Sequence, residues 1–266
     1  MPDNNFAGLR TALEAIMREA GELARETSRR PFKRWTKGHD DSPVTEGDIA
    51  VNDLLRARLG DLLPAAAWVS EETPGAPDRT PPLAWVVDPI DGTRAYIAGR
   101  ADWSISVALV ENARPRLAAL YAPAAEEMFL AAEGTGAALN GARIAVSGGG
   151  ALTGAKLAGP KRYLEKLAAL DASILPQPRV PSLALRLARV AQGELDAAFS
   201  SPGSHDWDLA AADLLVHEAG GLFTDFSGQT LTYTAPQAEH GALLAAGGAR
   251  HRLLIETLRD RRGEFA

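Results

Sequence analysis

Two aspartates spaced three residues apart are the feature of this sequence that most clearly suggests chemistry. The segment 85–93 reads Trp-Val-Val-Asp-Pro-Ile-Asp-Gly-Thr, so Asp88 and Asp91 follow an apolar run typical of a buried strand. Pro89 holds Asp88 in an extended conformation, and Gly92 permits a tight turn. Two such carboxylates can face one cation, and hard oxygen ligands suit Mg²⁺, which is commonly shared with phosphate oxygens. A turn carrying two solvated acids is the alternative that these residues leave open.

Two more acidic segments repeat this theme. The stretch 68–72 is a short apolar run that ends in Glu71 and Glu72, and His205-Asp-Trp-Asp208 opens an expected helix. Each has an ordinary explanation, because surface Glu pairs are common and the helix dipole favours acids at a helix start. Thr93 is expected to be the N-cap of a short helix over 94–98, whose first backbone N–H groups would form an anion-binding end.

Overall composition excludes several kinds of partner. The 266 residues include 28 Lys and Arg against 34 Asp and Glu, a net charge of −6, which argues against binding a nucleic-acid polymer. Something other than net charge would therefore have to hold an anionic substrate, and a metal ion is the obvious candidate. The N-terminus lacks the pattern of a signal peptide, and no run of about 18 apolar residues predicts a membrane span. We therefore expect a soluble cytoplasmic protein.

Several catalytic chemistries are also excluded. With no cysteine, disulfides, thiolate zinc sites and cysteine nucleophiles are absent. The five histidines never stand four residues apart, which disfavours a zincin, and no Gly-x-Ser-x-Gly elbow occurs. The glycines at 149 and 154 have the spacing of a P-loop, but Ala155-Lys156-Leu157 follows them, so a flexible linker is the better interpretation.

The elements that must position these acids predict an α/β (α+β) chain with a mixed sheet layered by helices. The three strands within 103–132 follow one another closely, which indicates an antiparallel meander. A small, glycine-rich stretch at 147–154 predicts a boundary between an N-terminal α+β subdomain, 1–150, and a C-terminal α/β subdomain, 151–266, that supplies Asp208. We expect helices at 6–34 (with a break near Pro31), 48–62, 160–169, 182–193, 207–218 and 248–259, and strands at 67–69, 83–87, 103–110, 116–122, 127–132, 155–158, 195–199 and 242–246.

Together the acidic segments resemble a known family signature. Glu71-Glu72, Asp88-Pro-Ile-Asp-Gly-Thr93, and Trp207-Asp208 followed by Glu218-Ala-Gly-Gly221 are similar to the motifs of the inositol monophosphatase superfamily of Mg²⁺-dependent, lithium-sensitive phosphatases. Ser42-Pro-Val-Thr45 and Asp48 also resemble its N-terminal segment. The resemblance covers nearly the whole chain in the right order. It implies a layered αβαβα sandwich and hydrolysis of a small phosphate monoester.

The resemblance also implies two or three Mg²⁺ ions in one site. The first would be held by Glu71, Asp88 and the carbonyl of Ile90. The second would be held by Asp88, Asp91 and Asp208, with Asp88 bridging both. A third, weaker site would use Asp48 and Glu71. Two cations about 3.5–4 Å apart can neutralise a phosphate and stabilise its leaving oxygen.

Catalytic and phosphate-binding residues follow from the same resemblance. Thr93 with Asp48 would orient and activate the attacking water, and Glu71 belongs to this catalytic group. The backbone N–H groups of Gly92 and Thr93 would hold the phosphate, and Asp208 would also contact the substrate.

Three positions bear on which phosphate ester is cleaved. Ser201 stands seven residues before Asp208, where inositol phosphatases usually carry a Glu, and this disfavours myo-inositol phosphate. Arg186 falls where 3'(2'),5'-bisphosphate nucleotidases tend to have a Lys that meets the second phosphate, and an Arg could bind it bidentately. A solvated helix Arg beside Arg189 is the alternative. Lys37, followed by Asp41-Ser42-Pro43, is similar to a segment found both in the nucleotidases and in the histidinol-phosphatase branch. Lys161 is a weaker candidate for a phosphate contact.

The chain is thus most similar to the 3'(2'),5'-bisphosphate nucleotidase branch, which implies conversion of adenosine 3',5'-bisphosphate to AMP, a recycling step of sulfate assimilation. Inositol-1-phosphate and histidinol phosphate are the alternative substrates, and a non-catalytic regulator that binds phosphorylated ligands is the alternative class. Many relatives are homodimers, so a homodimer is expected too, with the apolar stretch 103–132 as its candidate interface.

Overall fold

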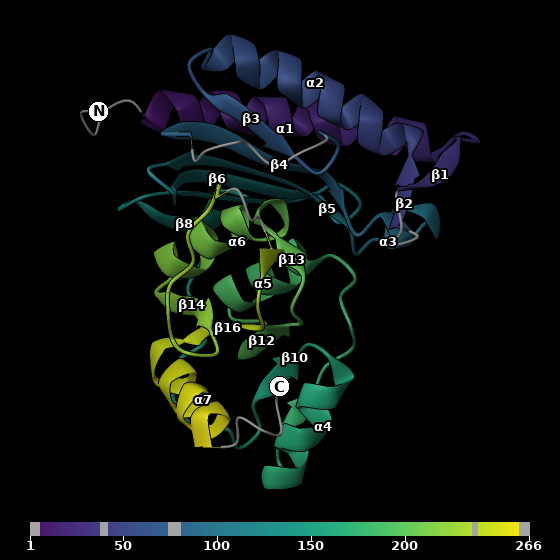
Figure 1. Ribbon diagram of the computed structural model, residues 1–266. Coiled ribbons are helices and arrows are strands. Elements are labelled where there is room, and N and C mark those ends of the chain that lie inside the picture. Colours follow the sequence, from purple (N-terminus) through teal and green to yellow (C-terminus); the bar gives the residue numbers. More distant parts are fainter. Residues whose placement is uncertain (1–5, 38–41, 74–80, 236–238, 261–266) are drawn as a thin grey trace.

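The computed structural model describes residues 6–37, 42–73, 81–235 and 239–260 and confirms the layered αβαβα arrangement (Figure 1). Helices α1 (Phe6–Ser28) and α2 (Glu46–Leu62) cover one face of a seven-stranded sheet. The other face packs on α5 (Leu183–Ala191) and α6 (Asp206–Glu218), which also contact a five-stranded sheet. Helices α4 (Lys161–Leu170) and α7 (Gly248–Asp260) form the last layer.

In the seven-stranded sheet β3 runs parallel to β4, and every other neighbouring pair is antiparallel. The strands, in their spatial order, are β3 (Ala67–Ser70), β4 (Leu83–Asp91), β5 (Ser104–Glu111), β6 (Arg114–Ala122), β7 (Glu127–Ala132), β8 (Gly136–Leu139) and β9 (Ala142–Arg143). The meander predicted within 103–132 is therefore confirmed. Its apolar side chains are buried against α1 on one face and α6 on the other. The expectation that this stretch forms a homodimer interface is wrong, because helices of the same chain already cover it.

The five-stranded sheet has the order β11 (Leu175–Pro176), β10 (Lys156–Ala158), β12 (Ala197–Ser200), β16 (Leu243–Gly247) and β14 (Gly221–Asp225). Two further strand pairs are β1 (Arg34–Lys37) with β2 (Ser42–Thr45) and β13 (Ser204–His205) with β15 (Glu239–His240). The remaining helix is the short α3 (Thr93–Ile97). Sequence periodicity missed β14 and the short strands β1, β2, β8, β9, β11, β13 and β15, since strands of two to five residues carry too few positions for a clear pattern.

The first helix is shorter than predicted. It ends at Ser28 instead of at residue 34, which is already the first residue of β1. Pro31 accounts for this, because proline supplies no N–H to a helix and disfavours the helical conformation of the residue before it. The other predicted helices are found within a few residues of their expected bounds.

Three apolar cores separate the layers. One lies between α1, α2 and the seven-stranded sheet, and another between the five-stranded sheet, α4 and α7. The central core joins Leu120 of the first sheet to Leu187 of α5 and Leu215 of α6. Because helices from the second half of the chain share this core with the first sheet, the division at 147–154 stays a prediction. None of the helices in the described part of the chain combines the length and apolarity that crossing a bilayer requires.

The carboxylate of Glu218 links the end of α6 to the turn between β7 and β8. Its two oxygens accept hydrogen bonds from the backbone N–H groups of Gly134, at 2.8 Å, and Gly136, at 2.7 Å. Both glycines have positive φ angles, 74° and 86°, so the turn presents both N–H groups to one acceptor. This contact fixes α6, the helix that also carries Asp208.

We expect Glu218→Ala to lower the free energy of unfolding by about 1–3 kcal/mol, because two backbone donors lose a charged acceptor. Thermal and denaturant unfolding measure the loss. The matched control is Glu256→Ala, at an exposed position of α7, which should leave the melting temperature unchanged. Equal stabilities of the two variants would contradict the structural role of Glu218.

Candidate active site

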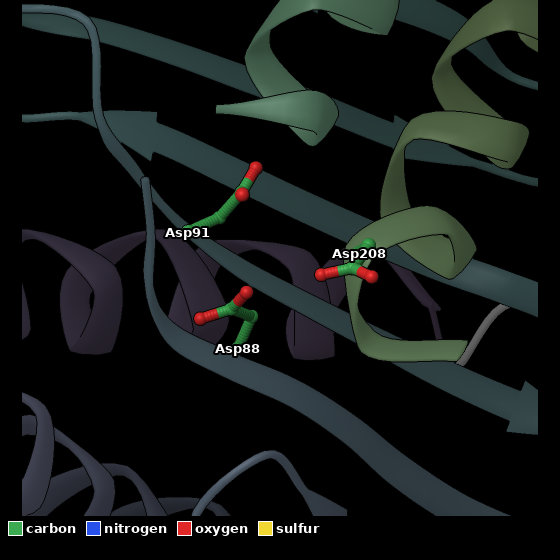
Figure 2. Close-up of side chains that lie close together, drawn as sticks. All are labelled: Asp88, Asp91 and Asp208. Atoms are coloured by element: carbon green, nitrogen blue, oxygen red, sulfur yellow. The ribbon is translucent and has the colours of Figure 1, made fainter. Parts of the chain in front are cut away.

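Asp88, Asp91 and Asp208 meet where the carboxyl end of β4 faces the first turn of α6 (Figure 2). One carboxylate oxygen from each lies within 4.8 Å of the other two. Asp88 and Asp91 are 2% and 7% exposed, and Asp208 is half-buried. The sequence motifs at 85–93 and 205–208 are therefore brought together as predicted, and the alternative of two solvated acids in a turn is wrong.

A β-bulge puts both aspartates of β4 on the same side. Asp88 pairs with Ser106 and Asp91 with Ser104, so three steps along β4 match two steps along β5. In a regular strand, residues three apart point to opposite faces, and one extra residue reverses that relation. Pro89 lies inside the bulge, where its missing N–H costs no ladder hydrogen bond.

The carboxylates at this site repel one another. Burial raises the pKa of Asp88 well above its ordinary value, and the charges of Glu71, Asp91 and Asp208 raise it further. The pKa of Asp208 is raised by burial and by Asp91. Burial also raises the pKa of Asp91, opposed by hydrogen bonds from the Ser182 hydroxyl, at 2.6 Å, and the Ala184 N–H, at 2.7 Å. Buried like charges of this kind fit a divalent cation, which offsets their repulsion and takes oxygen ligands.

Glu71 and Ile90 lie beside these three aspartates. Glu71 directly follows β3, and its N–H donates to the Val87 carbonyl at 3.2 Å, which places it next to the end of β4. Glu71 and Ile90 line the same cavity as Asp88, with a volume of about 420 Å³. The Ile90 N–H donates to Asp88 Oδ1 at 3.0 Å, which holds that carboxylate in place.

Thr93 and Asp48 form a hydrogen-bonded pair next to the cluster. The Thr93 hydroxyl lies 3.3 Å from Asp48 Oδ1 and 3.1 Å from the Ile90 carbonyl, both acceptors. The other Asp48 oxygen accepts from the Thr45 N–H, at 2.7 Å, and hydroxyl, at 2.6 Å, closing the capping box of α2. Burial raises the pKa of Asp48 to about 6, although the Thr45 hydrogen bonds oppose this. One carboxylate thus starts a helix and holds a candidate catalytic hydroxyl.

Gly92, and not Thr93, is the N-cap of α3, so the expected capping role of Thr93 is wrong. Thr93 is the first helical residue, and its hydroxyl points to Ile90 and Asp48 instead of its own helix. Gly92 has φ +92°, and an added Cβ would lie 3.1 Å from the Ser182 nitrogen. The left-handed conformation and the lack of space both require glycine here.

Asp206, a residue that sequence reasoning passed over, fixes the start of α6. It is buried, with Oδ1 2.7 Å from His240 Nε2 and Oδ2 accepting from the Thr234 N–H at 2.5 Å. The His205 N–H donates to Asp208 Oδ2 at 2.7 Å. These contacts set the direction of the Asp208 side chain. The sequence offered only one signal, a second acid two residues before Asp208.

A second cavity, of about 970 Å³, adjoins the first and shares Arg94, Arg179 and Asp208 with its lining. It lies over the N-terminal ends of α4 and α5, and its lining includes Lys161 and Ser201. This volume is typical of small-molecule sites in proteins. Sequence reasoning missed Arg94 and Arg179, because a single arginine in a loop or short helix carries no recognisable pattern.

Arg186 also lines the larger cavity and is only 7% exposed. Its Nη1 donates to the Phe199 carbonyl at 3.0 Å, and its buried Nε has no hydrogen-bond partner within the described residues. Burial lowers its pKa to about 10; Asp91 opposes this and the Arg179 charge adds to it. The solvated alternative for Arg186 is therefore wrong, whereas Arg189 pairs with Glu127 at 2.5 Å. Lys37 ends β1, but its side chain lies outside the described residues.

Comparisons with known proteins agree with this geometry. The model of the inositol monophosphatase family matches residues 7–262. A Pseudomonas aeruginosa protein named Nus factor SuhB is 37% identical over 235 residues, covering 83% of this chain and 86% of the relative. Inositol monophosphatase 2 of Solanum lycopersicum is 34% identical, covering 84% and 89%. The structure of a Thermotoga maritima IMPase superposes with a TM-score of 0.82 at 27% identity, covering 95% and 97%.

Buried carboxylates in a five-layer α/β sandwich, with a cationic cavity beside them, define a metal-dependent phosphoric monoester hydrolase. The chain belongs to the inositol monophosphatase family. The superfamily expected from the motifs is confirmed, whereas the named relatives do not single out the bisphosphate nucleotidase branch.

We expect Asp88→Asn to abolish Mg²⁺-dependent phosphate release and to raise the melting temperature of the metal-free protein. The amide has nearly the same shape but removes one of the repelling charges. Malachite-green phosphate assays and thermal unfolding with and without Mg²⁺ measure both effects. Asp61→Asn, at an exposed position of α2, is the control and should alter neither. Near-normal turnover by Asp88→Asn would refute the assignment of the site.

Proposed function

We propose that the chain is a Mg²⁺-dependent 3'(2'),5'-bisphosphate nucleotidase that converts adenosine 3',5'-bisphosphate to AMP and phosphate in the cytoplasm. The observation that carries this proposal is Arg186, a buried cation with an unpartnered Nε in a cavity of about 970 Å³ next to the acidic cluster. In a substrate with two phosphates, one phosphate would bind at the metal held by the carboxylates and the other would bind to the arginine. Ser201 in the same lining offers a hydroxyl where a glutamate would contact inositol.

Each residue of the acidic site has a role in this reaction. Asp88, Asp91, Asp208 and Glu71, with the Ile90 carbonyl, would hold two or three Mg²⁺ ions. The bound ions would supply Lewis-acid stabilisation of the phosphoryl and leaving oxygens. The backbone N–H groups of Gly92 and Thr93 would orient the scissile phosphate, because the first N–H groups of a helix have no intrahelical acceptor.

Thr93 and Asp48 would handle the attacking water. Since the Thr93 hydroxyl donates its own proton to Asp48 or to the Ile90 carbonyl, its oxygen lone pairs can accept a hydrogen bond from water. This orients the water, and the proton that it releases passes towards Asp48 Oδ1. Water attack on phosphorus then breaks the phosphorus–oxygen bond to the 3' oxygen, which takes up a proton from a solvent water molecule as it leaves.

Inositol-1-phosphate hydrolysis is the second candidate, favoured by the name of the Solanum lycopersicum relative. Histidinol phosphate hydrolysis stays a weaker alternative. All three reactions would use the same carboxylates and would differ in the larger cavity. The homodimer implied by the resemblance also stays a proposal, with its interface on a surface other than the covered meander.

We expect kcat/KM to be highest for adenosine 3',5'-bisphosphate when it is compared with inositol-1-phosphate and histidinol phosphate. The reason is that only the nucleotide brings a second phosphate to Arg186. Assays run in parallel in Mg²⁺, with and without Li⁺, measure the ranking and the lithium sensitivity. If the nucleotide ranks below either competitor, the proposed substrate is wrong. A lack of turnover across a broad panel of phosphate esters would favour the alternative of a non-catalytic regulator that binds phosphorylated ligands.

Replacing Thr93 by Val should lower kcat by about 10²–10⁴-fold, since the oriented water loses its acceptor and its route for the proton. Thr93→Ser keeps the hydroxyl and should keep most of kcat. The apparent Mg²⁺ affinity, measured by calorimetry, should be similar in both variants because the carboxylates are untouched. Equal kcat values for Val and Ser would remove Thr93 from the mechanism.

A further inference from the structure

The cationic side chains of the larger cavity outnumber the acids that could neutralise them. Four cations, Arg94, Lys161, Arg179 and Arg186, and two carboxylates, Glu165 and Asp208, line the cavity. Asp208 belongs to the metal cluster, and Glu165 lies 3.5 Å from Lys161. Arg94 and Arg179 are therefore left without a carboxylate of their own in this lining, and Arg186 has only the charge of Asp91, which lines the adjoining smaller cavity.

Two of these arginines lie close enough to repel each other. Arg179 and Arg186 line the same cavity, and the charge of Arg179 lowers the pKa of Arg186. Arg186 is buried and its Nη1 is held by the Phe199 carbonyl, so it cannot move away. Arg179 is exposed and lies on the irregular segment between β11 and α5. Within the described part of the chain neither Arg94 nor Arg179 forms an ion pair. Like charges that line one cavity are stabilised by an anion bound between them.

Arg179 also lines the smaller cavity with the metal-binding carboxylates. It therefore borders both the place of the scissile phosphate and the space beyond it. The second anion of a substrate would lie in the larger cavity, because the smaller cavity is already lined by the carboxylates of Glu71, Asp88 and Asp91. The buried Arg186 offers that anion a guanidinium group in a fixed position, and the exposed Arg179 can move to contact the same anion.

We propose that Arg179 is a specificity-determining residue, which closes with Arg186 on a second anionic group of the substrate's leaving portion. The inference rests on the proposed function only in that the phosphate at the carboxylates is the one cleaved. It needs no nucleoside, since any bisphosphorylated small molecule of suitable reach brings the same two charges. Arg94, at the junction of the two cavities, faces the scissile phosphate in this arrangement.

The experiment uses a matched pair of substrates, adenosine 3',5'-bisphosphate and adenosine 3'-monophosphate, which differ only in the second phosphate. For the unaltered protein the ratio of the two kcat/KM values should strongly favour the bisphosphate. In Arg179→Gln that ratio should fall at least about tenfold, the loss typical of one charge-assisted hydrogen bond. Arg179→Lys should give an intermediate ratio, because it keeps the charge but not the fork. Arg252→Gln, an exposed arginine of α7, is the control and should keep the original ratio.

Inhibition by AMP, which lacks the scissile 3' phosphate, supports the same test. AMP carries only the phosphate that the arginine pair would hold, so Arg179→Gln should raise the inhibition constant of AMP by a similar factor. If Arg179→Gln lowers kcat/KM equally for both adenosine compounds, or leaves both unchanged, the inference is overturned.

Failure of the proposed nucleotidase activity would look different. If neither adenosine compound is hydrolysed, the nucleotide is the wrong substrate, and the same ratio is measured with inositol 1,4-bisphosphate and inositol-1-phosphate. A fall in that ratio in Arg179→Gln keeps the inference without the nucleoside. If no bisphosphate is preferred over its monoester in either pair, the second-anion site is refuted.

Discussion

Mutual repulsion among buried carboxylates is the constraint on which the rest of this structure depends. Asp88, Asp91 and Asp208 hold their oxygens within 4.8 Å of one another, in surroundings that raise the pKa of all three. Such an arrangement opposes folding unless other contacts enforce it, because each buried charge loses hydration and gains a like neighbour. The site therefore belongs to the class in which stability is given up for a preorganised set of ligands.

Rigid elements on every side supply the enforcement. The bulge in β4 sets Asp88 and Asp91 on one side of the strand, and β4 is hydrogen-bonded on both edges, to β3 and β5. Asp91 also accepts from Ser182 and Ala184 at the start of α5, a position where the helix dipole favours a negative charge. Each carboxylate is thus part of the local structure that positions it, as Asp48 is part of the capping box of α2.

The same contacts connect the acidic cluster with the larger cavity. Asp91 contacts the N-terminus of α5, and one turn further along this helix Arg186 enters the larger cavity. The acids that would hold cations line the smaller cavity, and the arginines that would hold anions line the adjoining larger one. This arrangement would reconcile a net charge of −6 with an anionic substrate, because the local potential would be set by a few groups and by a cation bound among the carboxylates.

The sequence by itself determined which acidic residues could act as ligands, the strand that carries two of them and the helix that carries the third. These are local properties, visible in the apolar run before Asp88 and the acidic start of α6. Only the tertiary structure decided that Asp88 and Asp91 point the same way, since a bulge depends on the partner strand β5. It also decided that the apolar meander is covered by helices, that Arg186 is buried, and that Arg179 joins it from another segment. The physical reason is that periodicity records which residues prefer to be buried, whereas the surfaces that bury them come from distant parts of the chain.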